Sequence, residues 1–168
     1  MTTGRVPAGF LALLIAGTAS VVGAAPQGGT TACDAAQPVN VLSVVGPMVG
    51  SHPAWLVDGS SRWTGSASPI KTLWVLAQPT AGIEISGRRR GGSEVATFQR
   101  GSEPPTDRLT VADPKRDSVK PGGASADVLQ AHAFIPSLVF YPVPGCWEFT
   151  VVSVGVRSRI VRNLEARP

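Results

Sequence analysis

Short apolar segments, each broken by Gly, Pro, Ser or Asp, make up the chain from residue 39 onward. β-Branched and aromatic residues dominate these segments, and turn residues recur about every 8–12 positions, which is the spacing of an all-β sandwich or barrel. No segment sustains the i, i+3, i+4, i+7 spacing of an amphipathic helix. The pattern predicts an all-β fold with strands at residues 39–45, 54–58, 72–77, 82–86, 94–99, 109–112, 137–141, 147–156 and 158–164.

Two segments depart from this regular pattern. The best helical candidate, residues 125–132, is barely two turns long, and Val128 stands where a capping box needs Glu or Gln. Residues 101–126 combine prolines and charged residues with few large apolar ones. We therefore expect residues 101–126 to form a long exposed loop or a partly disordered insert.

The apolar face changes within residues 147–156. Trp147, Phe149 and Val151 share one face of an extended chain, whereas Val152 and later valines share the other. Because side chains of a strand alternate strictly between faces, this change predicts a β-bulge near residues 151–153 or a strand buried on both faces.

A glycine-flanked turn with three arginines lies between two of the predicted strands. Ile83 and Ile85 alternate with Glu84 before the turn, and an apolar run follows it at residues 94–99. This arrangement predicts a β-hairpin. Its tip would carry Arg88, Arg89 and Arg90.

The N-terminus has the pattern of an export signal. Arg5 is the sole charged residue among the first 33, and an apolar stretch at residues 10–17 is followed by small residues up to Ala25. A short basic region, a compact apolar core and a small-residue exit predict a secretory signal peptide at residues 1–25. Residues 26–38 would then form the mature tail, and residues 39–168 the β-sandwich domain. The alternatives are an uncleaved signal anchor and a buried apolar segment.

The mature chain holds two cysteines, Cys33 and Cys146. An even number of cysteines in an exported protein predicts one disulfide, here between the mature N-terminus and a strand near the C-terminus. The alternative role for Cys33 is lipid attachment, but Thr30, Thr31 and Ala32 precede it in place of the Leu-Ala-Gly pattern of bacterial lipoproteins.

An apolar strand, a Pro-Gly corner and an aromatic-led strand follow one another in residues 134–149, around Pro144, Gly145, Cys146 and Trp147. This order resembles the E-to-F corner of immunoglobulin-like sandwiches. With the earlier run at residues 71–75, it also resembles a loose group of exported bacterial proteins of unknown function. The resemblance implies an immunoglobulin-like β-sandwich of seven to nine short strands, and it implies no activity.

Charge and composition exclude several classes of protein. The 168 residues include 19 Gly and 15 Pro, too many for a helix bundle, while 43% hydrophobic residues are too many for a disordered chain. The net charge of +4 is a mild excess that is spread along the chain, without the clustered charge and interleaved aromatics of a nucleic-acid binder. We expect no specific nucleic-acid partner, and membrane contact only if the N-terminal segment is retained.

Patterns of catalytic and metal-binding residues are weak. His52, His132, Cys146 and Met48 match a blue-copper site in number, but no His or Met follows the cysteine as such sites require. Ser68 and Lys71 match Ser-x-x-Lys, a common chance pattern, without the companion motifs of the enzymes that use it. We therefore predict no catalytic residue, metal or cofactor.

The most defensible interaction site is the group of three arginines, Arg88, Arg89 and Arg90, which could hold phosphate, sulfate or carboxylate groups. Charged hairpin tips also serve simply to keep sheets soluble and to block edge pairing. Trp63 is the one tryptophan expected to be exposed. The sequence predicts an exported, non-catalytic binding or accessory module of unknown extracellular or envelope ligand. The alternatives are a small exported hydrolase with a site assembled only in three dimensions, and a membrane-tethered component of an envelope assembly.

Overall fold

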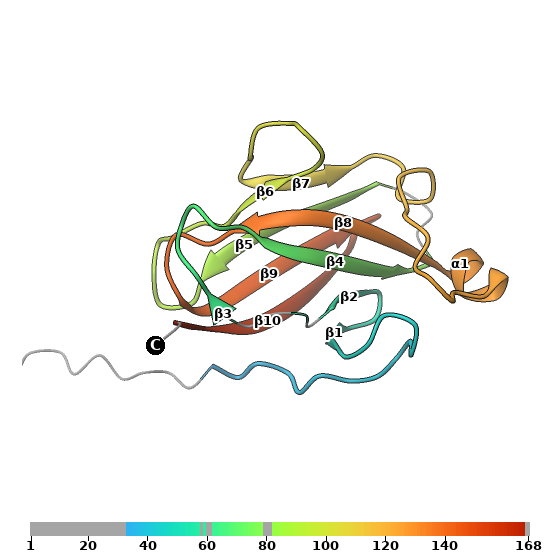
Figure 1. Ribbon diagram of the computed structural model, residues 1–168, viewed down its shortest axis with the longest axis horizontal. Helices are drawn as coiled ribbons and strands as arrows, with labels where there is room; N and C mark the ends of the chain where they lie inside the picture. The colour runs from blue at the N-terminus through green and yellow to red at the C-terminus, as the bar shows by residue number, and fades with distance from the viewer. Residues whose placement is uncertain (1–32, 58, 60–61, 79–81, 167–168) are drawn as a thin grey trace, which may run out of the picture. The chain divides into compact units, whose positions relative to one another are not determined.

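The computed structural model describes residues 33–57, 59, 62–78 and 82–166 (Figure 1). The predicted signal peptide, residues 1–25, and the first part of the predicted tail lie outside the described residues. No helix in the described part of the chain is long and apolar enough to cross a membrane.

Two five-stranded sheets face each other, as the sequence predicts for an all-β sandwich (Figure 1). Ten strands occur in the described residues, and α1 (Ala126–Ala131) leads into β8. The first sheet has the order β1 (Met48–Ser51), β2 (Ala54–Val57), β4 (Ile70–Ala77), β8 (His132–Phe140), β6 (Thr97–Gln99). The second has the order β3 (Arg62–Trp63), β10 (Val156–Ala166), β9 (Gly145–Ser153), β5 (Ile83–Arg89), β7 (Arg108–Val111).

The main core lies between the sheets and is built by strict alternation of side chains. Trp74 of β4 is fully buried, and its ring centroid lies 5.2 Å from that of Phe149 on β9. The indole Nε1 of Trp74 donates a hydrogen bond of 2.9 Å to Ser137 Oγ, so the polar edge of this ring is satisfied within the core.

A second apolar cluster covers the outer face of the first sheet. Met48, Trp55, Val75 and Phe134 are buried there under Leu42, Val45, Val128 and Leu129. The strands β4 and β8 are thus covered on both faces, which explains their nearly continuous apolar sequences. The short α1 supplies part of this cover, and it begins at the predicted helical candidate with the Ser125 Oγ accepting a hydrogen bond from Val128 N.

The change of face in residues 147–156 has a different cause from the two predicted. β9 ends at Ser153 and β10 begins at Val156, so Val154 and Gly155 form a two-residue turn between antiparallel strands. Both turn residues have positive φ, 42° and 76°, as the turn type that best matches strand twist requires. The prediction of a bulge or of one strand buried on both faces is therefore wrong.

The predicted hairpin around the three arginines is formed only in part. Arg89 N bonds to Glu94 O and Ala96 N bonds to Gly87 O, both at 3.0 Å, so the turn closes locally. The chain then crosses to the other sheet, where β6 pairs with β8 instead of with β5. β7 takes the position beside β5.

Two other expectations about chain segments need adjustment. Residues 39–45 form no strand, since Val39 makes only an isolated bridge to Met48. Residues 101–126 are largely exposed, as expected, yet they contain β7 and are held by an ion pair of 3.2 Å between Arg100 and Asp117. The hydrogen bond from Arg100, and after it the bond from Arg116, lowers the pKa of the Asp117 carboxyl.

Gly87 of β5 is required by close packing. A methyl group at this position would lie 2.7 and 2.8 Å from two carbons of the buried Phe149 ring. We expect Gly87→Ala to lower the free energy of unfolding by about 1–3 kcal/mol, because the ring has no room to move. Urea denaturation measures this, with Gly122→Ala as the matched control, since nothing lies within 4 Å of a methyl group there. Equal stabilities for the two variants would contradict the packing.

Candidate functional site

The three predicted arginines differ in their surroundings. Arg88 lies in β5 and is exposed, whereas Arg89, also in β5, makes a 3.0 Å ion pair with Glu94. The pKa of Glu94 is lowered, first by a hydrogen bond from its own backbone N–H and then by Arg89. Arg90 follows the strand and lies 3.6 Å from Glu148 and 3.9 Å from Asp34. The arginines therefore lie largely on the sheet, with carboxylates beside two of them.

Trp63 is less accessible than its sequence neighbours suggest. It lies in β3, beside the C-terminal end of β10, and is half-buried against the main core. Its Nε1 donates a 2.8 Å hydrogen bond to the backbone oxygen of Tyr141. The sequence predicts an exposed ring, whereas in the structure the ring is held against one end of the sandwich and helps to close it.

The residues considered for nucleophilic catalysis are not brought together. Ser68 and Lys71 lie at the start of β4, where Ile70 pairs with Val139. His132 pairs with Ala77 at the other end of this strand, and Pro53, next to His52, accepts the backbone N–H of Ala77. The whole length of β4 thus separates the serine and lysine from both histidines.

The same holds for the residues weighed as a copper site. Met48 is fully buried in the second cluster, and Cys146 is joined to Cys33 in a disulfide with a Cα–Cα distance of 5.4 Å. Within the described residues, no group of three or more His, Cys, Asp or Glu is arranged to hold a metal ion. The predicted disulfide is therefore formed, and a lipid on the Cys33 sulfur would require breaking it.

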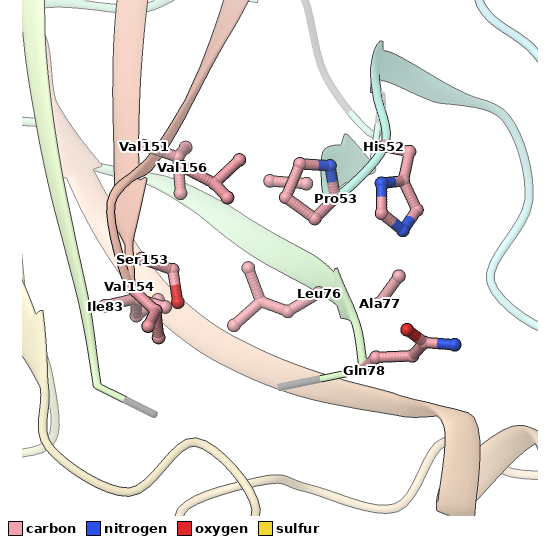
Figure 2. Close-up of a pocket in the computed structure, with 11 residues that line it drawn as sticks. His52, Pro53, Leu76, Ala77, Gln78, Ile83, Val151, Ser153, Val154 and Val156 are labelled. Carbon is pink, nitrogen blue, oxygen red and sulfur yellow. The ribbon is translucent and has the colours of Figure 1, made fainter. Parts of the chain in front are cut away.

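A hollow opens between the two sheets at the end of the sandwich that carries the β9–β10 turn (Figure 2). Its volume is about 180 Å³. Leu76 of the first sheet and Ile83 and Val151 of the second form its apolar inner wall. The buried Ala54 also belongs to this wall. The remaining lining comes from the rim, at His52, Pro53, Ala77, Gln78, Ser153, Val154 and Val156.

Backbone strain is concentrated at the rim of this hollow. In the described part of the chain, two residues other than glycine have positive φ, Gln78 at 45° and Val154 at 42°. Both line the hollow, although Gln78 follows a strand of the first sheet and Val154 follows a strand of the second. A left-handed conformation costs about 1–2 kcal/mol for a residue with a Cβ, and more for a β-branched one such as valine. Two such residues at one site mark a place where the fold tolerates strain.

The rim also exposes apolar surface to water. Val154 is 68% exposed and Val156 is 51% exposed, the largest values among the large apolar side chains that the structure describes. The polar groups nearby are few: Ser153 Oγ donates to the backbone oxygen of Gly82 at 3.3 Å, Gln78 contributes an amide and His52 an imidazole. An apolar wall with a few polar groups at its mouth suits a small, mainly apolar ligand group.

Sequence reasoning missed this hollow because its members are scattered over three connections, β1–β2, β4–β5 and β9–β10. The signal present in the sequence is the pair Val154-Gly155, a valine where a two-residue turn favours Asn or Asp. Reading residues 147–156 as one strand concealed that signal.

Arg162 is buried, at 3% exposed, although Arg157 and Arg159 on the same strand are exposed. Its position follows from the alternation of β10, in which Ser158, Ile160 and Leu164 also point inward.

Comparisons with known proteins identify the fold. No family model matches the chain, and no curated protein matches it. A crystal structure of a candidate lipoprotein from Bacillus anthracis matches with a TM-score of 0.52 and 14% sequence identity, over 79% of this chain and 86% of that one. At this identity the likeness shows that the two chains share an all-β fold.

Proposed function

We propose that this chain is an exported, non-catalytic binding module and that the hollow between its sheets is the binding site for an apolar group. The signal-like N-terminus and the disulfide support export, because structural disulfides persist in oxidising compartments. The similarity to a protein described as a candidate lipoprotein agrees with a place in the bacterial envelope.

We also propose that the sandwich is immunoglobulin-like in its central strands. β4 pairs with β8, and β5 and β10 flank β9, as strands B–E and C–F–G do in that fold. The topology departs from the immunoglobulin fold between β5 and β8. There the chain joins the first sheet as β6 and then returns to the second sheet as β7.

The observation that carries the binding proposal is the strained rim. Val154 keeps an unfavourable conformation and an exposed apolar side chain, although Asn or Gly would fit the same turn without strain. Val154 destabilises its own turn, so we explain its presence there by a contact that its side chain makes at the mouth of the hollow.

The test uses linear alcohols as probes and isothermal calorimetry as the measurement. Because each buried methylene contributes about 0.8 kcal/mol, affinity should rise roughly fourfold per carbon from 1-butanol to 1-hexanol. We expect Val154→Asn to raise the free energy of unfolding by about 1 kcal/mol and to weaken 1-hexanol binding several-fold.

Two further variants separate the site from general surface effects. Ser153→Leu should fill the hollow, since residue 153 continues the inward-facing series of β9, and should abolish alcohol binding in a folded protein. Val41→Asn is the matched control, because Val41 is 44% exposed and lies outside the hollow. The proposal would be wrong if 1-hexanol bound to the parent protein and to all of these variants with the same affinity. It would also be wrong if 1-hexanol did not bind to the parent protein.

A further inference from the structure

Two arginines contact one carboxylate on the outer face of the second sheet, and a third arginine lies opposite it on the neighbouring strand. Arg159 Nη2 lies 2.6 Å and Arg90 Nε lies 3.6 Å from the same oxygen, Glu148 Oε2. Arg88 is directly across from Glu148 in the β5–β9 register. The three side chains come from β5, the residue after it, and β10, with Glu148 on the strand between them.

The carboxylate fixes the arginines without neutralising them. Arg90 and Arg159 contact Glu148, and Arg88 lies opposite it in the register, so three positive charges stand beside one close carboxylate. The more distant Asp34 lies 3.9 Å from Arg90, and its side chain is 81% exposed. Each guanidinium has five N–H donors, and one carboxylate oxygen accepts only a few of them. Two of the arginines are thus held in place with donors still available, which lowers the entropy cost of binding an anion.

The surface beside these side chains is recessed in two places, which share Arg90. One depression, of about 200 Å³, is lined by Arg88, Arg89, Arg90, Glu148 and Thr150. The other, of about 240 Å³, has Arg90, Arg159 and Asp34 in its lining. Ser86 and Thr150 are paired across β5 and β9 in the next row, so their hydroxyl-bearing positions adjoin the arginines. The hollow between the sheets adjoins Ser153, at the opposite end of β9 from this group.

We propose that Arg88, Arg90 and Arg159 form an oxyanion site that takes a phosphate group. Arginine is suited to phosphate because its planar donors bond two oxygens at once. A phosphate group has enough oxygens to accept hydrogen bonds from all three arginines. A second carboxylate would offer the arginines only the same kind of contact that Glu148 already makes. The phosphate would belong to an anionic phospholipid headgroup or to a soluble phosphate polymer, and the site recognises the chemistry they share.

The experiment measures binding of inorganic pyrophosphate by NMR, through the backbone and arginine Nε–H signals, at 50 and 200 mM salt. We expect signals of Arg88, Arg90 and Arg159 to shift together, and the affinity to fall at the higher salt concentration. Arg88→Gln and Arg159→Gln should each weaken binding at least fivefold. Arg157→Gln is the matched control, since Arg157 is an exposed arginine on the same strand as Arg159, and it should change the affinity less than twofold.

Two arms then distinguish the source of the phosphate. Sedimentation with vesicles of phosphatidylcholine, with and without phosphatidylglycerol, tests a headgroup, and titration with polyphosphate tests a polymer. Binding in either arm that is lost in Arg159→Gln and retained in Arg157→Gln supports the site. Absence of pyrophosphate binding, or equal losses in all three arginine variants, would overturn it in favour of diffuse charge attraction.

Discussion

Replacing Cys33 and Cys146 together with alanine should lower the free energy of unfolding by about 4 kcal/mol. The two residues are 113 positions apart, so their disulfide closes nearly the whole described chain into one loop. In the chain-entropy account, a loop of this length restricts the unfolded state by about 4–5 kcal/mol. The bond also holds the start of the segment that carries Leu42 and Val45 over the second apolar cluster.

Urea denaturation of the double variant and of the reduced parent protein measures this effect. The two should unfold at the same urea concentration, well below that of the oxidised parent. A loss smaller than 1 kcal/mol would show that residues 33–47 are already detached in the folded state, so that closing them adds nothing.

The single tyrosine should titrate near pH 12 in the folded protein and near pH 10 in urea. Tyr141 is 1% exposed, and this burial raises the pKa of its phenol to about 12, against an opposing effect of the Arg162 charge. Because the folded state holds the proton more tightly, the stability is fully present below pH 10 and falls as the pH rises from 10 to 12. The loss amounts to roughly 2–3 kcal/mol at the upper limit.

Absorbance at 295 nm follows this group alone, since the chain contains one tyrosine. Tyr141→Phe is the control, and its stability should fall less steeply between pH 10 and 12 than that of the parent. A midpoint near 10 in the folded protein would mean that water reaches the phenol, and that the aromatic cluster of Tyr141, Trp147 and Phe149 is open.

The sequence was sufficient to predict those features that depend on local alternation and chain chemistry. The all-β class and the positions of most strands follow from period-two patterns such as that of β9. The disulfide follows from the number of cysteines and the export pattern. The aromatic-led strand expected after the Pro-Gly corner is β9, which begins at Gly145.

What could not be predicted depends on which sheet a strand joins. The turn after Arg90 has hairpin chemistry, but β6 gains more by covering β8 and placing Phe98 against Trp74 than by continuing beside β5. No local pattern encodes that choice, because it depends on partners about 40 residues away.

The candidate site shows the same limit. The three arginines were visible as a run, but the carboxylate between Arg90 and Arg159 comes from a strand more than 50 residues away from Arg90. The hollow joins the ends of β2, β4, β5 and β9, and its clearest sequence signal, Val154, conflicts with the local preference of its own turn. Such conflicts between local preference and global fold are expected at functional sites.

The central claim is that the hollow beside Val154 binds an apolar group, and a methyl-detected NMR titration with 1-hexanol tests it most directly. We expect the methyl signals of Leu76, Ile83, Val151 and Val154 to shift with one common affinity, while those of Val39 and Val41 stay unchanged. If the exposed valines outside the hollow shifted as much as its lining, or if the lining did not respond, the hollow would be a packing defect and the claim would fail.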